Sequence, residues 1–306
     1  MERGSEGSRV KRILARDNYY AVINGYKDIF LDNNATLNSG DDYYVTGTTF
    51  FQIYGLYCFD RNLRIILLKA LLQAEQNICT KVSYRFSEVY TSEFSHLNVN
   101  NFSKTNLPKA TELVSKLSNA TQRNARHTML SHYLTTHQDL PLWVLVTKLT
   151  FGEITNFYKL ITPNIQERIL KDIHKEYTGE YKVSITDPTS TLIPVFSEIL
   201  DVLVGYRNVC AHGDRLYNHR IIGPKKTIKK LTYYFVQTPK GSESSVYGVL
   251  ISLRLLLPRI SYKCIIDEVI NELILLSESL PVIQFNQVLA RMELTLQWKQ
   301  TLELLQ

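Results

Sequence analysis

The most regular pattern of apolar residues lies between Thr49 and about Arg85. Apolar side chains recur there at steps of three and four residues, the spacing of one face of a helix. The stripe consists of Leu56, Leu63, Ile66, Leu67, Ala70, Leu71 and Ala74. The pattern predicts a long helix. Asp60 is a candidate cap for a helix that begins at FDRNLR, because its carboxylate can accept free amide protons of a first turn.

Similar helical spacing occurs elsewhere along the chain. It predicts helical segments over 11–31, near Ala110–Leu117, over 141–161 with a break at Phe151-Gly152, over 163–178 and over 188–212. The helix at 188–212 has a second candidate start after Pro194, which gives a core of about 194–213. Gly213 is its expected C-terminal stop. Residues 245–306, rich in Leu and Ile, predict two or three helices of no assigned role.

Polar segments separate these helices. Residues 1–10 predict a flexible tail, and residues 32–48, rich in Asn, Asp, Gly and Thr, predict a loop. A short hairpin is an option across Ile222–Phe235. The expected architecture is therefore all-α, with one helical domain over 11–306 that carries inserted loops and additional helices.

The composition is that of a soluble globular protein, with 44% apolar and 21% charged residues and a net charge of +6. The modest positive charge favours polyanionic partners only slightly. No secretory leader or membrane span is expected. The four cysteines are widely spaced, without a CxxC pair, and predict buried thiols in the cytoplasm: Cys58, Cys79, Cys210 and Cys264.

The candidate chemistry lies in the sequence YRNVCAHGDRLYN. Asn208 and His212 are four residues apart and share a helix face, so Asn208 can bond His212 and fix its tautomer. Arg207 is turned by about 140° from His212 on the same helix. Two copies that cross at a two-fold axis could bring both pairs around one cleft.

Such residues suit RNA cleavage by the internal 2′-hydroxyl, which needs no metal or other cofactor. Histidine can move protons near neutral pH, and arginine can stabilise the negative charge that develops on phosphate. The alternative is structural: Arg207 forms a salt bridge, and His212 stabilises the end of a helix.

Four stretches in order resemble the Abi family of abortive-infection proteins (AbiD/AbiF-like), over most of the chain up to about residue 235. They are NYYAVINGYKDIF (18–30), TGTTFFQIYGLYCFDRNLRIILLKALLQAEQNI (46–78), LPLWVLVTKLTFGEITNFYKLI (140–161) and YRNVCAHGDRLYNHR (206–220). The resemblance implies a HEPN-type antiparallel helical bundle, usually dimeric. It also implies a role in phage defence or in a toxin–antitoxin system.

The resemblance further implies that Arg207, Asn208 and His212 are the catalytic residues of a metal-independent endoribonuclease. Glu75 and Asp214 are expected to support them. The family's helical Glu usually precedes an Arg by four positions, where this chain has Cys79. The ion pair of Glu75 is then either missing or supplied from elsewhere, for example by Lys81 or Arg85. Another HEPN subgroup has a Tyr two places after the His, which a partner nucleotidyltransferase modifies. This chain has Asp214 at that place, so we infer no partner nucleotidyltransferase.

A basic patch follows the motif and is a candidate RNA track, with a solvated loop as the equal alternative: Arg215, Arg220, Lys225, Lys226, Lys229 and Lys230. Three functions remain open at this point. The first is an endoribonuclease toxin that acts on RNA as a homodimer and is restrained by a cognate RNA or protein antitoxin. The second is a non-catalytic RNA-binding or regulatory HEPN module. The third is a protein-interaction subunit.

Overall fold

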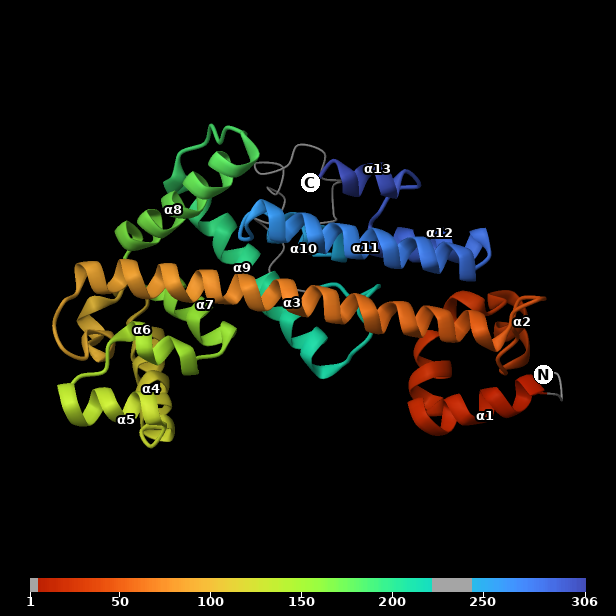
Figure 1. Ribbon diagram of the computed structural model, residues 1–306, viewed down its shortest axis with the longest axis horizontal. Helices are drawn as coiled ribbons and strands as arrows, with labels where there is room; N and C mark the ends of the chain where they lie inside the picture. The colour runs from red at the N-terminus through yellow and green to blue at the C-terminus, as the bar shows by residue number, and fades with distance from the viewer. Residues whose placement is uncertain (1–4, 222–243) are drawn as a thin grey trace.

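One helix runs through the centre of the protein. The structure is a computed structural model that describes residues 5–221 and 244–306. Helix α3 (Phe50–Val89) has 40 residues, which corresponds to a length of about 60 Å, and the other helices are arranged on both sides of it (Figure 1). Thr49 caps it: its side chain accepts from the amide of Gln52, and the Gln52 side chain accepts from the amide of Thr49.

Asp60 does not cap a helix, so that prediction was wrong. It lies inside α3, more than two turns after the start, and is fully buried. A short polar residue near a predicted helix start has the sequence signature of a cap, but here the helix already began at Phe50.

Helices α7 (Phe151–Leu160), α8 (Pro163–Tyr181), α9 (Thr189–His212) and α11 (Arg259–Ser279) pack around α3. Figure 1 shows α11 lying along α3 and α9 crossing it. Their buried apolar side chains form one connected core with those of α3. Helix α11 therefore packs along α3, although the two helices lie about 200 residues apart in the sequence.

The remaining described elements are α-helices and single helical turns. The α-helices are α1 (Ser5–Asp17), α2 (Asn33–Ser39), α4 (Leu107–Asn124), α5 (Thr128–His132), α6 (Leu142–Leu145), α10 (Val246–Arg254), α12 (Val282–Met292) and α13 (Trp298–Glu303). Single turns of 3₁₀ or π geometry are η1 (Tyr20–Asn24), η2 (Lys27–Phe30), η3 (Ser95–Leu97), η4 (Val99–Asn101), η5 (Lys104–Asn106), η6 (Tyr133–His137) and η7 (Val146–Lys148). The described residues contain two isolated β-bridges and no strand.

The all-α prediction is confirmed, with differences at particular segments. Helix α1 begins at Ser5, inside the segment expected to be a flexible tail, and α2 occupies part of the expected loop at 32–48. Residues 245–306 form four helices rather than two or three. The hairpin considered at Ile222–Phe235 lies outside the described residues.

Helix α9 carries the motif and belongs to the core. Within the described ranges, α9 alone is long and apolar enough to cross a membrane by composition. It packs against α3, α7, α8 and α10, and its buried residues include Phe196, Leu200 and Leu203, as expected of a core helix. Gly213 ends it in the left-handed conformation, with φ of 80°, as the sequence predicts.

Candidate functional site

The motif residues lie in the last two turns of α9. Asn208 and His212 are exposed, whereas the Arg207 side chain is 30% exposed and points toward α3. Within the part of the chain that the structure describes, no hydrogen bond joins Asn208 to His212, although their four-residue spacing allows one. A single chain therefore presents the histidine to solvent and holds the arginine against its own core.

Glu75 of α3 is the partner of Arg207. The guanidinium Nε lies 3.5 Å from the carboxylate Oε2, and both atoms are buried without a hydrogen bond. Burial raises the pKa of Glu75, and the nearby Arg207 charge opposes that shift. The pair is thus close enough for electrostatic attraction but is not joined by a well-formed hydrogen bond.

The ion pair of Glu75 was expected to be missing or supplied from elsewhere, for example by Lys81 or Arg85. It is supplied from elsewhere, by Arg207. The two examples were wrong, because Lys81 pairs with Glu176 and Arg85 binds Asp172 through two nitrogens, each at 2.7 Å. Cys79, one turn after Glu75, is buried, and burial raises its thiol pKa to about 12.

A buried network around Asp60 holds the loop that follows the motif. The Asp60 carboxylate accepts hydrogen bonds from the backbone amides of Leu216 (3.1 Å) and Tyr217 (2.6 Å) and from the hydroxyl of Tyr26 (2.6 Å). Arg64, one turn further along α3, lies 2.5 Å from the same carboxylate. We call these groups the Asp60 network.

The same network reaches Asp214. Arg64 also donates to the main-chain carbonyl of Asp214, at 3.1 Å. Asp214 was expected to support the motif, and it does contact the network, but through its backbone rather than its carboxylate. Burial raises the pKa of Asp60, and its four donors act in the opposite direction. A buried carboxylate needs this many partners to remain stable as an ion.

Sequence reasoning missed this network. Its members come from three of the four stretches that resemble the Abi family: Tyr26 from the first, Asp60 and Arg64 from the second, and residues 214–217 from the fourth. That shared origin was the one available signal. Without coordinates, nothing in the local sequence connects Asp60 to amides about 156 positions away.

A second set of contacts ties the same loop to the C-terminal helices. Arg291 of α12 donates to the hydroxyl of Tyr217, at 3.0 Å, and pairs with Asp28 at 2.5 Å. Arg215 donates to the carbonyl of Gly25, at 2.7 Å, and lies near Asp28. This gives residues 245–306 a structural role that their sequence did not reveal.

The expected RNA track is only partly described. Arg215 makes the intramolecular contacts just given, and Arg220 forms an ion pair with Glu293. Both arginines are therefore engaged within the protein. Lys225, Lys226, Lys229 and Lys230 lie outside the described residues.

An apolar stripe borders the motif on α3. Ile65 is 63% exposed and Leu72 is 46% exposed, and the partly buried Leu68 lies between them on the same helix face. At about 100° per residue, this face is next to the one that carries Arg64 and Glu75. Exposed apolar side chains in a row are typical of a surface that contacts another protein.

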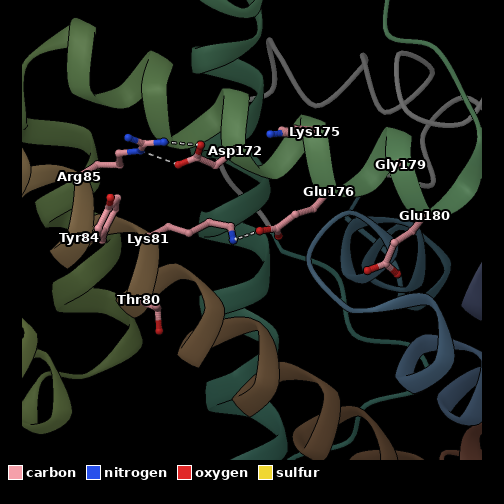
Figure 2. A pocket seen from close by; sticks show the side chains of 9 residues that line it. All are labelled: Thr80, Lys81, Tyr84, Arg85, Asp172, Lys175, Glu176, Gly179 and Glu180. Carbon is pink, nitrogen blue, oxygen red and sulfur yellow. Dashed lines mark hydrogen bonds and ion pairs between the residues drawn. The ribbon is translucent and has the colours of Figure 1, made fainter.

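A groove with a volume of about 580 Å³ lies elsewhere, between α3 and α8. Figure 2 shows that its charges face each other, with Arg85 bound to Asp172 and Lys81 to Glu176. These cations are already neutralised, so the groove offers a phosphate little net positive charge. Neither Arg207 nor His212 lines it.

The fold and this site together define a class of protein. Its described residues are helical, and a core helix packed against the central one, α9, carries an arginine, an asparagine and a histidine near its C-terminal end, with the following loop fixed by buried hydrogen bonds.

Comparison with known families supports a narrower statement. A sequence profile of the family described as Abi-like protein matches residues 12–218, which is more than half of the chain. The chain therefore belongs to the Abi-like family, whose biological setting is abortive infection, a form of phage defence. The matched region contains Glu75, the Asp60 network and the whole motif. No curated protein and no solved structure matches the chain.

Proposed function

We propose that this Abi-like protein is a HEPN-type endoribonuclease that acts in the cytoplasm in phage defence or in a toxin–antitoxin system. One observation carries the proposal. Arg207 lies beside Glu75 without a hydrogen bond, and the adjacent Asn208 and His212, five positions further on, are exposed on a helix end fixed by buried contacts. An exposed histidine and asparagine on a rigid support favour chemistry over a purely structural role.

The proposed reaction is attack of an RNA 2′-hydroxyl on the adjacent phosphorus. His212 takes the proton of the 2′-hydroxyl or gives one to the departing 5′-oxygen, and Arg207 stabilises the charge on the phosphorane. The products are a 2′,3′-cyclic phosphate and a 5′-hydroxyl. Asn208 orients His212 or the phosphate.

A second copy of the chain completes this site in our proposal. A rotation of about 140° separates Arg207 from His212 on one helix. Two copies related by a two-fold axis are therefore needed to place an arginine and a histidine around one phosphate. The exposed stripe of Ile65, Leu68 and Leu72 borders the site and is the face we assign to the homodimer.

The deciding experiment is RNA cleavage in the presence of EDTA. Purified protein is incubated with total RNA and with tRNA, beside His212→Ala and Arg207→Ala variants. His137→Ala and Arg126→Ala, which alter exposed residues away from α9, serve as matched controls. We expect cleavage by the wild type and both controls, and none by the two motif variants.

Cleavage by His212→Ala at the wild-type rate would overturn the catalytic assignment. No cleavage by a folded, RNA-free wild type would favour the second candidate, a non-catalytic RNA-binding or regulatory module. The Glu75–Arg207 pair supports that alternative, because it partly neutralises the arginine. Co-purified RNA, visible as a raised ratio of absorbance at 260 to 280 nm, would distinguish this module from a protein-interaction subunit. A cognate RNA or protein antitoxin is part of the proposal for the toxin.

A further inference from the structure

A small cleft lies beyond the C-terminal end of α3, away from the motif. It is formed by residues 87–96 and by residues 139–143 before and within α6, and its volume is about 180 Å³. Sites for drug-sized ligands usually measure roughly 300–1,000 Å³, so this cleft suits a single ring system. Glu75 is about 12 residues earlier on α3, a separation of roughly 18 Å along the helix.

Aromatic side chains line the cleft. They are Tyr90, Phe94 and Trp143, and Trp143 is 54% exposed, which is unusual for the largest side chain. Phe94 adopts a left-handed backbone conformation, with φ of 45°, that non-glycine residues rarely take. Such strain is found most often where a site must hold a fixed shape.

Asp139 fixes that shape and keeps one oxygen unused. Its Oδ1 accepts from the amides of Phe94 and Leu140, each at 2.8 Å. Within the described residues its Oδ2 accepts no hydrogen bond. Because Asp139 lines the cleft, it brings a carboxylate oxygen with free lone pairs to the cleft wall.

His96 supplies a second unused group. Its side chain lines the cleft, the residue is only 1% exposed, and its Nε2 is buried without a hydrogen bond. Burial lowers the pKa of His96 to about 4, and Asp139 opposes that shift, so the imidazole is neutral at pH 7. An unsatisfied buried nitrogen is costly, and a ligand that bonds it would remove the cost.

We propose that this cleft binds a guanine base of single-stranded RNA. Trp143 stacks on the ring, the Asp139 Oδ2 accepts from the ring N–H and amino groups of guanine, and His96 Nε2 bonds a further edge atom. Adenine has an acceptor where guanine has its ring N–H, so its edge repels the carboxylate. The inference rests on the proposed action on RNA and adds a recognition site several nucleotides from the cut.

The test uses the fluorescence of Trp143. The chain has two tryptophans, and Trp298→Phe leaves Trp143 as the reporter. We expect GMP to quench it saturably, with a Kd at least about tenfold lower than that of AMP, CMP or UMP. Asp139→Asn keeps an oxygen for the two amides but removes the charge, and should erase most of the preference for GMP.

The controls separate this site from the nuclease. Trp143→Phe, with Trp298 retained, should show no quenching, and His212→Ala in the Trp298→Phe background should bind GMP normally. Equal quenching by all four nucleotides, no quenching at all, or an unchanged preference in Asp139→Asn would overturn the guanine site. RNA cleavage without GMP binding would support the proposed nuclease and contradict the guanine site. GMP binding without RNA cleavage would support the guanine site and contradict the proposed nuclease.

Discussion

Two carboxylates of helix α3, those of Asp60 and Glu75, pair with arginines in ways that differ in almost every physical respect. Asp60 is fully buried and receives hydrogen bonds from Arg64, Tyr26 and two backbone amides. Glu75, about 22 Å further along the helix, has Arg207 beside it at 3.5 Å with no hydrogen bond. The Asp60 carboxylate is saturated with hydrogen bonds, whereas the Glu75 Oε2 that faces Arg207 has none.

The difference suggests separate roles: the Asp60 network stabilises the fold, and the Glu75–Arg207 pair belongs to the proposed reactive site. A buried carboxylate is tolerated only when donors replace its lost water, and the Asp60 network supplies them from distant parts of the chain. In the proposed function Arg207 binds phosphate, and the 30% of its side chain that is exposed has to supply the donors, because its Nε is buried beside Glu75. The predictions below test this contrast from the largest expected effect to the smallest.

Removal of the Asp60 carboxylate should be the most damaging change. Asp60→Ala leaves the Arg64 guanidinium, the Tyr26 hydroxyl and two amides without their acceptor, which should lower the free energy of unfolding by about 3–5 kcal/mol. Urea denaturation followed by circular dichroism measures it. Asp201→Ala, which breaks the exposed pair with Lys159 on the motif helix, is the control and should cost less than about 1 kcal/mol. Equal losses would mean that the network does not hold the loop.

A smaller loss is expected from Tyr26→Phe, which deletes one donor and keeps the ring. The variant should be destabilised by about 1.5–3 kcal/mol, since the hydroxyl bonds a buried charge. Tyr57→Phe changes a neighbouring ring whose hydroxyl has no hydrogen bond in the described residues, and should stay within about 0.5 kcal/mol. A neutral Tyr26→Phe would show that the carboxylate does not need this donor.

Coupling between Glu75 and Arg207 should be weak. A double-mutant cycle with Glu75→Gln and Arg207→Gln should give an interaction free energy below about 1 kcal/mol, as for loosely paired ions. The matching cycle with Asp60→Asn and Arg64→Gln should give a clearly larger value. Similar values for the two cycles would remove the contrast on which this interpretation rests.

The smallest effect is a dependence on pH. Burial raises the pKa of Glu75, so the folded protein should lose stability as the pH rises from the unfolded value of about 4.3 through the raised pKa. Glu75→Gln cannot ionise, and its stability relative to wild type should therefore improve over that window. Thermal unfolding at a series of pH values measures it.

Glu112 provides a control whose effect on stability should change with pH in the opposite direction. Its hydrogen bond with Lys116 lowers its pKa, so the wild type should gain stability over Glu112→Gln as the pH rises. If both variants followed the same trend, the shift assigned to Glu75 would be wrong.

The parts of the fold that the sequence predicted are those set by local chemistry. The stripe on α3 follows helical spacing, and Gly213 ends α9 because glycine adopts positive φ without strain. The motif was found for a similar reason, since all its members lie within six residues.

The sequence could not predict the partners of these residues. Asp60 reads locally as a cap, but its acceptor atoms are used by amides of Leu216 and Tyr217 far along the chain. Glu75 meets a cation from another helix rather than one four positions away. The cleft around His96 joins the end of α3 to the start of α6, which only the tertiary structure brings together.

The contacts of Arg291 have a consequence for the order of events during synthesis. A chain emerges from the ribosome N-terminal end first, so the motif helix and its loop are exposed before α12 exists. Until Arg291 arrives, Tyr217 and Asp28 lack one of their partners. We expect a nascent chain that ends before Val282 to be cut more readily by protease near Arg215 than the full chain. Maturation of the motif loop then waits for nearly complete translation, which delays any activity at His212 until the protein has been made.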